Sequence, residues 1–250
     1  SPKAALAFAL TPDWTVRGSI GRAVRFPTVS ELYQGTISTN VIVNNDPNLK
    51  PERSTTSELS LLKTVASGNW RATVFHERTR DALYSQTNVT VTPNVTSIQN
   101  VDAIRTTGLE LAGNWFDAGL EGLDISGSVT FADSIIREND NFPASVGQWQ
   151  PRVPRWRANL LASYRVNDHW SLTAGARYSG EQFNTLDNSD TNSDAYTGTS
   201  PFLVVDLRAK YTSDAHWRAA LGVDNVGNRT YWNFHPYNQR TWSAELRFDY

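Results

Sequence analysis

The sequence predicts an all-β protein: a transmembrane antiparallel β-barrel of which the chain supplies about eleven strands. Three observations lead to this fold class. Apolar and polar residues alternate over many segments, the connections between them are short and long in turn, and the 250 residues include 9 Trp, 9 Tyr and 10 Phe although mean hydropathy is low. A membrane barrel combines these features because every second side chain faces lipid and aromatic rings gather at both interfaces.

The alternation is clearest at the end of the chain. Between Thr241 and Tyr250, apolar side chains take every second position and polar ones the positions between. The segments that begin at Arg155 and Trp170 repeat the pattern, with aromatics near both ends of the apolar face. Each has roughly the 9–11 residues that a strand needs to cross a membrane. The full set of predicted strands is 2–11, 14–24, 54–67, 69–80, 103–116, 122–134, 155–165, 170–179, 201–212, 215–225 and 241–250.

The predicted connections alternate in length. Short turns rich in Gly, Pro, Asn, Asp and Ser are expected at 11–13, 67–69, 117–121, 167–168 and 213–214. Long connections are expected at 25–53, 81–102, 135–154, 181–200 and 226–240. Outer-membrane barrels have short periplasmic turns and long extracellular loops. A soluble β-sandwich, jelly roll or propeller also alternates polar and apolar residues, but it has no reason to alternate its loops in this way.

Composition argues against several classes of protein. Cys is absent, so neither disulfides nor thiolate metal sites are expected. A net charge of −2 provides no basic surface for nucleic acid. No apolar run approaches the ~18 residues of a transmembrane helix. The sequence holds no zincin-like His pair, phosphate-binding Gly loop or nucleophile elbow, so we expect neither an enzyme nor a bound metal or cofactor.

The odd number of strands indicates a partial barrel. Bacterial single-chain barrels have even strand numbers, and an open sheet would expose two unpaired edges to lipid. The chain begins at Ser1, with neither an initiator Met nor a signal peptide. We therefore expect residues 1–250 to be part of a barrel of about twice this size.

Four motifs resemble the TonB-dependent outer-membrane receptor family. Residues 21–33, GRAVRFPTVSELY, are similar to the family's R-x-x-R-x-P-T-x-x-E-L-Y segment, and residues 46–52, DPNLKPE, to its N-P-x-L-K-P-E. Residues 107–111, TGLEL, resemble its x-G-x-E-L strand, and residues 223–231, VDNVGNRTY, its V-x-N-L-F-(D/N)-x-x-Y. The motifs follow in family order over almost the whole chain. In departure from the family, Val226 and Gly227 replace Leu-Phe, and Tyr250 stands where Phe is commonest.

The same motifs also have structural explanations. Their prolines lack a backbone donor and belong outside paired strands. An ion-pair network at the lumen or the rim is expected from Arg22, Arg25 and Glu31, and Asn225 is expected to close a strand end through its side-chain amide. The acidic stretch 187–194 resembles a calcium loop but lacks its Gly and its terminal Glu, which favours a solvated loop.

Candidate ligand contacts lie in the long loops. Aromatic rings and Arg suit a planar, anionic iron chelate through stacking and charge, while the alternative for any such ring is a place in the interfacial girdle. The candidates are Tyr33, Phe142, Trp149, Phe183, Tyr196, Phe234, His235, Tyr237 and Arg240, with Tyr231 and Trp232 beside them as residues that also suit the girdle.

The resemblance implies a receptor in the outer membrane of a Gram-negative bacterium. It also implies that residues 1–250 are the C-terminal half of a barrel of about 22 strands, without the plug domain and the N-terminal strands. Such a receptor is closed by its own plug domain, through which the TonB–ExbB–ExbD complex supplies energy. The implied partners of this chain are the plug, the N-terminal barrel half, outer-membrane lipid and a ferric siderophore as cargo. Cobalamin, haem, copper or zinc chelates and oligosaccharides are alternative cargoes. A barrel protease or lipase and a soluble carbohydrate-binding β-sandwich are the alternatives from other classes.

Overall fold

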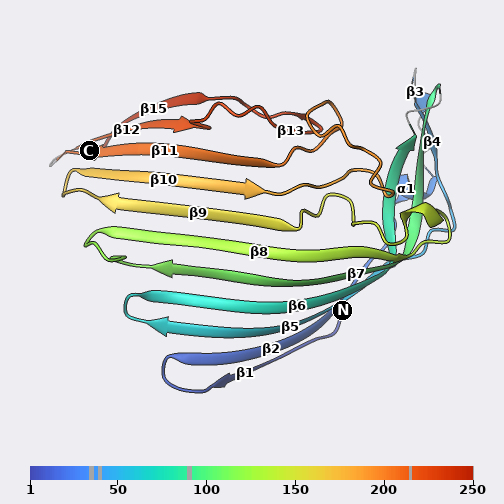
Figure 1. The fold of residues 1–250 in the computed structure, drawn as a ribbon, viewed down its shortest axis with the longest axis horizontal. Coiled ribbons are helices and arrows are strands. Elements are labelled where there is room, and N and C mark those ends of the chain that lie inside the picture. Colours follow the sequence, from blue (N-terminus) through green and yellow to red (C-terminus); the bar gives the residue numbers. More distant parts are fainter. Residues whose placement is uncertain (34–36, 39–40, 89–91, 214–215, 250) are drawn as a thin grey trace.

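One antiparallel ladder organises the computed structural model of the chain (Figure 1), which describes residues 1–33, 37–38, 41–88, 92–213 and 216–249. Its main strands are β1 (Lys3–Ala9), β2 (Trp14–Arg25), β5 (Glu52–Val65), β6 (Gly68–Asn88), β7 (Asn94–Trp115), β8 (Leu123–Glu138), β9 (Trp156–Arg165), β10 (Trp170–Ser179), β11 (Phe202–Thr212), β12 (Trp217–Asp224) and β15 (Thr241–Phe248). Each pairs with the next in this order within a 13-stranded sheet, so the predicted meander of about eleven strands is confirmed over the described residues.

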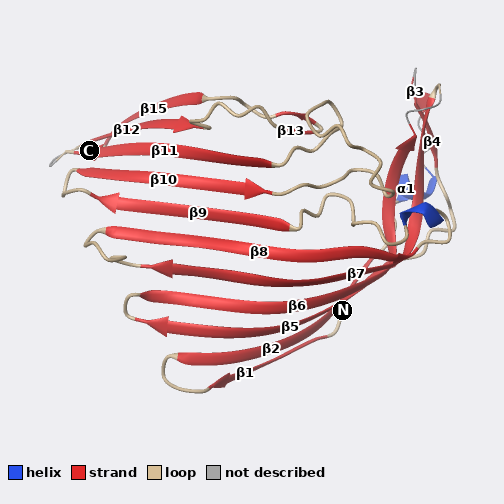
Figure 2. Ribbon diagram, in the orientation of Figure 1, coloured by secondary structure: helices blue, strands red, loops and turns tan. Residues whose placement is uncertain are grey.

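Few other elements occur in the described part of the chain (Figure 2). The helix α1 (Val29–Tyr33), the short strands β3 (Ile37–Ser38) and β4 (Val41–Asn44), and a 3-10 turn at Pro143–Ser145 lie in the long connections. A two-stranded ribbon of β13 (Trp232–Asn233) and β14 (His235–Pro236) lies before β15. No helix of the described residues is long and apolar enough to span a membrane.

The connections sort to the two ends of the sheet as predicted. Short turns gather at one end and long connections at the other, from β1 to β15 (Figure 1). We call these the turn end and the loop end. Part of the expected turn at 213–214 lies outside the described residues. The terminal aromatic Tyr250 also lies outside them.

The prediction of a long loop at 81–102 was wrong. Strands β6 and β7 continue through this region, in register from Ala82 opposite Val101 to Asn88 opposite Val95. Thr, Val and Ile favour strand conformation. Beyond the membrane no face has to be apolar, so the strand extension lacks the alternation by which the other strands are recognised. The connection 25–53 likewise contains α1 and the pair β3–β4, and β4 adds to β7 as a parallel strand.

The register assigns each strand one apolar and one polar face. Residues directly opposite each other in an antiparallel pair lie on the same side of the sheet. One row joins Leu160 to Ala176 and Gly127, and the adjacent row joins Asn159 to Arg177 and Ser128. Leu160, Leu109 and Val74 are 52%, 40% and 54% exposed on the first face. This side is the lipid face, and the face with Asn159 and Arg177 lines the lumen.

Aromatic rings mark both borders of the lipid face. At the turn end, Trp170 packs on Tyr211 with ring centroids 5.0 Å apart, and Trp217 packs on Phe248 at 4.8 Å. Toward the loop end, Phe131 packs on Trp156 at 4.9 Å. These are the interfacial girdles that membrane barrels need, since the rings suit the boundary between lipid and water.

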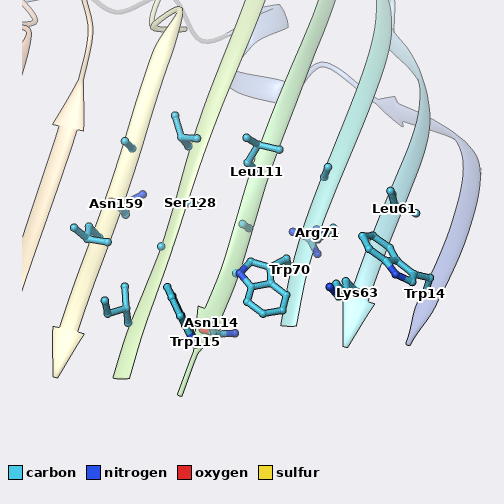
Figure 3. A pocket seen from close by; sticks show the side chains of 18 residues that line it. Trp14, Leu61, Lys63, Trp70, Arg71, Leu111, Asn114, Trp115, Ser128 and Asn159 are labelled. Carbon is cyan, nitrogen blue, oxygen red and sulfur yellow. The ribbon is translucent and has the colours of Figure 1, made fainter. Parts of the chain in front are cut away.

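A hollow of about 820 Å³ lies on the lipid face near the turn end (Figure 3). Its floor includes Gly113 and Gly127, which stand directly opposite each other on β7 and β8. A Cβ on Gly113 would come within 2.7 Å of the Trp70 ring, so the indole can lie across this strand only because the side chain is missing. The hollow opens toward lipid and not toward the lumen.

The small apolar core of the chain sits at the loop end. It consists of Ala82, Val101, Ile104, Ile136 and Leu186, all at most 3% exposed. Leu186 comes from the connection 181–200, so this core attaches that loop to the extensions of β6, β7 and β8. The membrane wall itself needs no such core, because lipid supplies its apolar surroundings.

The face assignment leads to the first prediction. Leu160→Arg in the intact protein should impair barrel assembly, because an Arg at the lipid midplane costs about 2–4 kcal/mol. Asn159→Arg, on the neighbouring position of the same strand, should be tolerated in the lumen. Heat-modifiable electrophoretic migration and surface abundance measure assembly. Equal assembly of the two variants would contradict the assignment.

Candidate functional site

The motif at 25–33 folds into a capped helix at the loop end. The Thr28 backbone N–H donates to Glu31 Oε2 at 2.7 Å, and the Glu31 N–H donates to Thr28 Oγ1 at 3.3 Å, which forms a capping box on α1. Arg25 Nη2 also donates to Glu31 Oε1 at 2.6 Å. The expected pair of Arg25 and Glu31 is thus present. The expectation that Arg22 joins it was wrong, because Arg22 lies three residues earlier on β2 and projects from the opposite, outward face.

Glu31 is an acid whose charge the fold stabilises. Partial burial alone would raise the pKa of Glu31, but the hydrogen bonds from Thr28 and Arg25 outweigh burial and hold the pKa below its ordinary value of 4.5. The carboxylate therefore links the end of β2 to α1 at neutral pH. Asn45 completes the link, since its side-chain amide donates to the Ser30 carbonyl at 2.7 Å.

Asn225 closes β12 as expected. Its backbone is left-handed, with φ 53°, a conformation that Asn adopts more readily than most residues. Its side-chain amide donates to the Arg229 carbonyl at 2.8 Å, and its Oδ1 accepts from the Arg229 N–H at 2.9 Å. The loop 226–240 therefore starts from a fixed turn.

Backbone contacts join the loop 226–240 to the loop 181–200. The Phe234 N–H donates to the Gly198 carbonyl at 2.9 Å, and the Thr197 N–H donates back to the Phe234 carbonyl at 3.0 Å. Further along, the Ser200 N–H donates to the Trp232 carbonyl at 3.0 Å. The two loops form one wall at the loop end.

The loop 135–154 joins the same wall. The Arg152 N–H donates to the Phe183 carbonyl at 2.8 Å. The Asn188 side chain accepts a hydrogen bond from the Trp149 backbone N–H at 2.8 Å and donates one to the Trp149 backbone carbonyl at 3.0 Å. We call the three connected loops, 135–154, 181–200 and 226–240, the loop wall.

The structure brings most of the candidate rings into three groups in the loop wall. Tyr196 meets Trp232 and His235 edge-on, with centroids 5.0 and 5.9 Å away. Trp149 lies 5.7 Å from Phe183. In the third group, Tyr237 stacks on Tyr231 at 4.7 Å with the ring planes only 7° apart. Phe234 meets a cation instead of a ring.

Three other candidates have different surroundings. Phe142 packs against the small core of the loop end, and Arg240 directs Nη2 and Nε at the Val226 carbonyl, at 2.6 and 3.0 Å. Tyr33 is 68% exposed on α1, and no ring contact within the described residues joins it to the loop wall. The first two side chains thus have structural partners.

Sequence reasoning missed two arginines of the loop wall. The guanidinium of Arg152 lies 4.3 Å from the centroid of the Phe234 ring, and that of Arg155 lies 4.4 Å from that of Trp149. Arg155 also pairs with Asp133 at 2.8 Å. Their one sequence signal is the stretch 150–155, where Pro151 and Pro154 hold the chain between two predicted strands.

A hollow of about 410 Å³ lies beneath the third ring group on the lumenal side. Arg177, Asp224, Tyr231 and Tyr237 contribute to its lining. Burial raises the pKa of Tyr231, while the positive charge of Arg177 acts in the opposite direction. Arg177 also pairs with Asp206 at 3.1 Å, and farther along Arg208 pairs with Asp224 at 2.9 Å. The hollow therefore combines aromatic rings with a partly neutralised cation.

The acidic loop 187–194 accepts hydrogen bonds from the backbone just before it. The Asp190 carboxylate accepts from the N–H groups of Asn184 and Thr185, at 2.7 and 3.1 Å. No group of three or more potential metal ligands occurs in the part of the chain that the structure describes. The solvated-loop interpretation stays a prediction.

Sequence comparison defines the class of protein. A family profile described as "TonB dependent receptor-like, beta-barrel" matches residues 1–226. The chain belongs to the TonB-dependent receptor family, whose members are outer-membrane β-barrels and not enzymes.

Individual relatives are distant but cover nearly all of the chain. The Iron-regulated outer membrane virulence protein of Vibrio cholerae is 25% identical over 236 residues, which are 88% of this chain and 35% of the relative. The structure is similar to the copper transporter OprC (TM-score 0.74, 17% identity, 98% of this chain and 39% of that one). It is also similar to the ferric enterobactin receptor PfeA of Pseudomonas aeruginosa in complex with enterobactin (TM-score 0.73, 20% identity, 99% and 40%). The chain thus spans less than half the length of these proteins.

The capping box leads to the second prediction. Glu31→Gln should speed hydrogen exchange of the backbone amides at 28–33, because a capping contact stabilises a helix by about 0.5–2 kcal/mol. Arg25 is half exposed, so its ion pair adds little. The difference from wild type should be present near pH 7 and disappear as the pH falls below 4.5 and through the lowered pKa, where wild-type Glu31 is protonated too. A difference that persists unchanged in acid would contradict the assigned role of the carboxylate.

Proposed function

We propose that this chain forms part of a receptor for the TonB-dependent uptake of a metal chelate, a ferric siderophore, across the outer membrane. The observation that carries the proposal is the lumenal mouth: the stacked pair of Tyr231 and Tyr237 lies over a hollow that Arg177 also lines. The proposal concerns the whole receptor, of which this chain supplies one part of the wall and loops.

The chemistry of the mouth suits a planar anionic ligand. Tyrosine rings offer flat apolar surface together with hydroxyl groups. Tyr237 is 46% exposed and accessible, whereas Tyr231 is 4% exposed and supports it from behind. Arg177 and Arg152 supply positive charge on the two sides of the loop 226–240. An iron chelate with aromatic, negatively charged arms matches these groups through stacking and charge.

The relatives support metal chelates as a cargo class. One sequence relative is named for iron regulation, and the solved structures include an enterobactin complex and a copper transporter. These names belong to distant proteins. The competing cargoes in the binding experiment below are therefore cobalamin, haem, copper or zinc chelates and, outside the class of metal chelates, oligosaccharides.

The proposed transport needs partners beyond this chain. We infer that the remaining wall strands close the barrel with β1 and β15, and that a plug domain fills the lumen. The ion pairs along the lumenal face, such as Arg71 with Glu110 at 2.6 Å, offer a polar but balanced surface for that plug. The TonB–ExbB–ExbD complex would act through the plug and not through this part of the wall.

The third prediction tests the loop 226–240. Replacing Phe234, His235 and Tyr237 together by Ala in the full-length receptor should weaken binding of a ferric siderophore about tenfold or more. The change removes two aromatic rings and one imidazole on which a planar ligand can stack, and each such contact contributes about 0.5–1 kcal/mol. Binding is measured by quenching of receptor fluorescence with a panel of ferric siderophores, cobalamin, haem, copper and zinc chelates and oligosaccharides.

Assembly must be separated from binding in this experiment. Val146→Ala, at an exposed apolar residue of the loop 135–154, is the control and should leave affinity unchanged. If the three residues only anchor the barrel at the interface, surface abundance or heat stability falls while the affinity of each assembled receptor stays the same. That result would contradict the proposed contact between the loop 226–240 and the cargo.

The fourth prediction concerns orientation. Epitope tags inserted at Asn188 in the loop wall of the full-length receptor should be labelled on intact cells, and tags at Asp13 in the first short turn only after the outer membrane is opened. The long connections of outer-membrane barrels lie outside the cell. Labelling at Asp13 in intact cells would reverse the assigned topology.

A further inference from the structure

Arginines gather on the outward face of the wall near the loop end. In one cross-strand row, Arg22 is opposite Thr55, Thr55 is opposite Arg78, and Arg78 is opposite Arg105. The next row toward the loop end places Arg53 opposite Arg80. Arg137 lines a hollow of about 450 Å³ with Arg78, Arg80 and Arg105. We call these residues the arginine patch: Arg22, Arg53, Arg78, Arg80, Arg105 and Arg137.

The arginine patch faces away from the lumen. Its rows continue the lipid face of the same strands, which toward the turn end carries Leu59 and Val74. The lumenal side chains at this height include Glu77 of β6 and Thr56 of β5, which bond to each other at 2.8 Å. Cargo in the lumen therefore does not explain the patch.

The height of the patch corresponds to the outer border of the membrane. Trp70 marks the turn-end girdle, and Arg78 and Arg80 follow 8 and 10 positions later on β6. At about 3.4 Å per residue this is about 27–34 Å along the strand. With a tilt of about 35–45°, the rise is roughly 19–28 Å, a range that includes the ~25 Å height of the apolar band. The guanidinium groups thus stand where the headgroups of the outer leaflet begin.

The patch is incompletely neutralised by the protein. Arg78 stands directly opposite Arg105, and Arg53 opposite Arg80, an arrangement that destabilises a sheet unless an anion intervenes. Among the described residues, Asp81 pairs with Arg53 and Lys50, and Asp133 with Arg105 and Arg155. Within the described ranges, Glu138 lines the hollow without a salt bridge, and no ion pair engages Arg22, Arg78, Arg80 or Arg137.

We propose that the arginine patch binds the phosphate groups of lipopolysaccharide in the outer leaflet. Arg recognises phosphate by paired, charge-assisted hydrogen bonds. A lipid that carries its phosphates at the border of the apolar layer brings them to this height and leaves its acyl chains on Leu59 and Val74. The patch thereby anchors one side of the wall to the outer leaflet, independently of cargo in the lumen.

The experiment uses the detergent-purified full-length receptor and diphosphoryl lipid A, the phosphorylated anchor of lipopolysaccharide, as the probe. The variant R78Q/R80Q removes two patch cations that have no ion pair with the described residues. The matched control R17Q/R157Q removes two cations from the lumenal face of β2 and β9, which are also without an ion pair there. Dephosphorylated lipid A and inorganic phosphate are the comparison ligands. Retained lipid A is counted by native mass spectrometry, and affinity is measured by titration.

The expected result is a loss of lipid A affinity of roughly 25-fold in R78Q/R80Q, since each Arg near an anionic surface contributes about a fivefold factor. The control should bind as wild type does, and dephosphorylated lipid A should bind the wild type weakly. Unchanged binding in R78Q/R80Q, or an equal loss in both double variants, would overturn the proposal. Inorganic phosphate that competes at the same concentration as lipid A would assign the patch to a soluble anion and would overturn it too. If R78Q/R80Q does not assemble, R137Q replaces it, with retention equal to wild type as the contradicting result.

Discussion

The requirement that every backbone N–H and C=O be paired in lipid determines the rest of this structure. The chain meets it with one uninterrupted antiparallel ladder, in which each main strand bonds to the next along the sequence. Because side chains alternate across such a ladder, the same pairing fixes which residues meet lipid and which meet the lumen. The girdle rings, the ion pairs of the lumen and the arginine patch all follow from that single register.

Charged side chains are placed and paired differently on the two faces of the sheet. In the lumen, several arginines have an acidic partner on the neighbouring strand, as Arg177 has in Asp206 and Arg208 in Asp224. On the outward face, the lipid band is almost free of charge, and cations appear only at its borders. Lys63 stands at the turn-end border, 5.1 Å from the ring centroid of Trp14, and the arginine patch stands at the other. The separation of these two groups of cations along the strands thus corresponds to the thickness of the membrane.

Much of this architecture could be predicted from the sequence, because alternation, turn composition and motif spacing are local properties. The strands from β8 to β12 fall close to their predicted positions, and Asn225 closes its strand as its side chain suggested. The extension of β6 and β7 was missed because strands outside lipid need no apolar face. The ring groups of the loop wall also could not be predicted from the sequence. Arg152 meets Phe234 across 82 positions of sequence (234 minus 152), through a fold that no local pattern encodes.

The loop wall has a consequence for how such receptors diversify. Its three loops are held to one another largely by backbone N–H and C=O groups, with side-chain hydrogen bonds from Asn188 and Ser200. Backbone bonds survive most substitutions, since every residue except Pro brings the same donor and acceptor. Exposed rings such as Tyr196 and Tyr237 can therefore be exchanged one at a time while the scaffold keeps its shape. Point mutations of such rings can therefore change the chemistry of this surface without insertions or a rebuilt barrel.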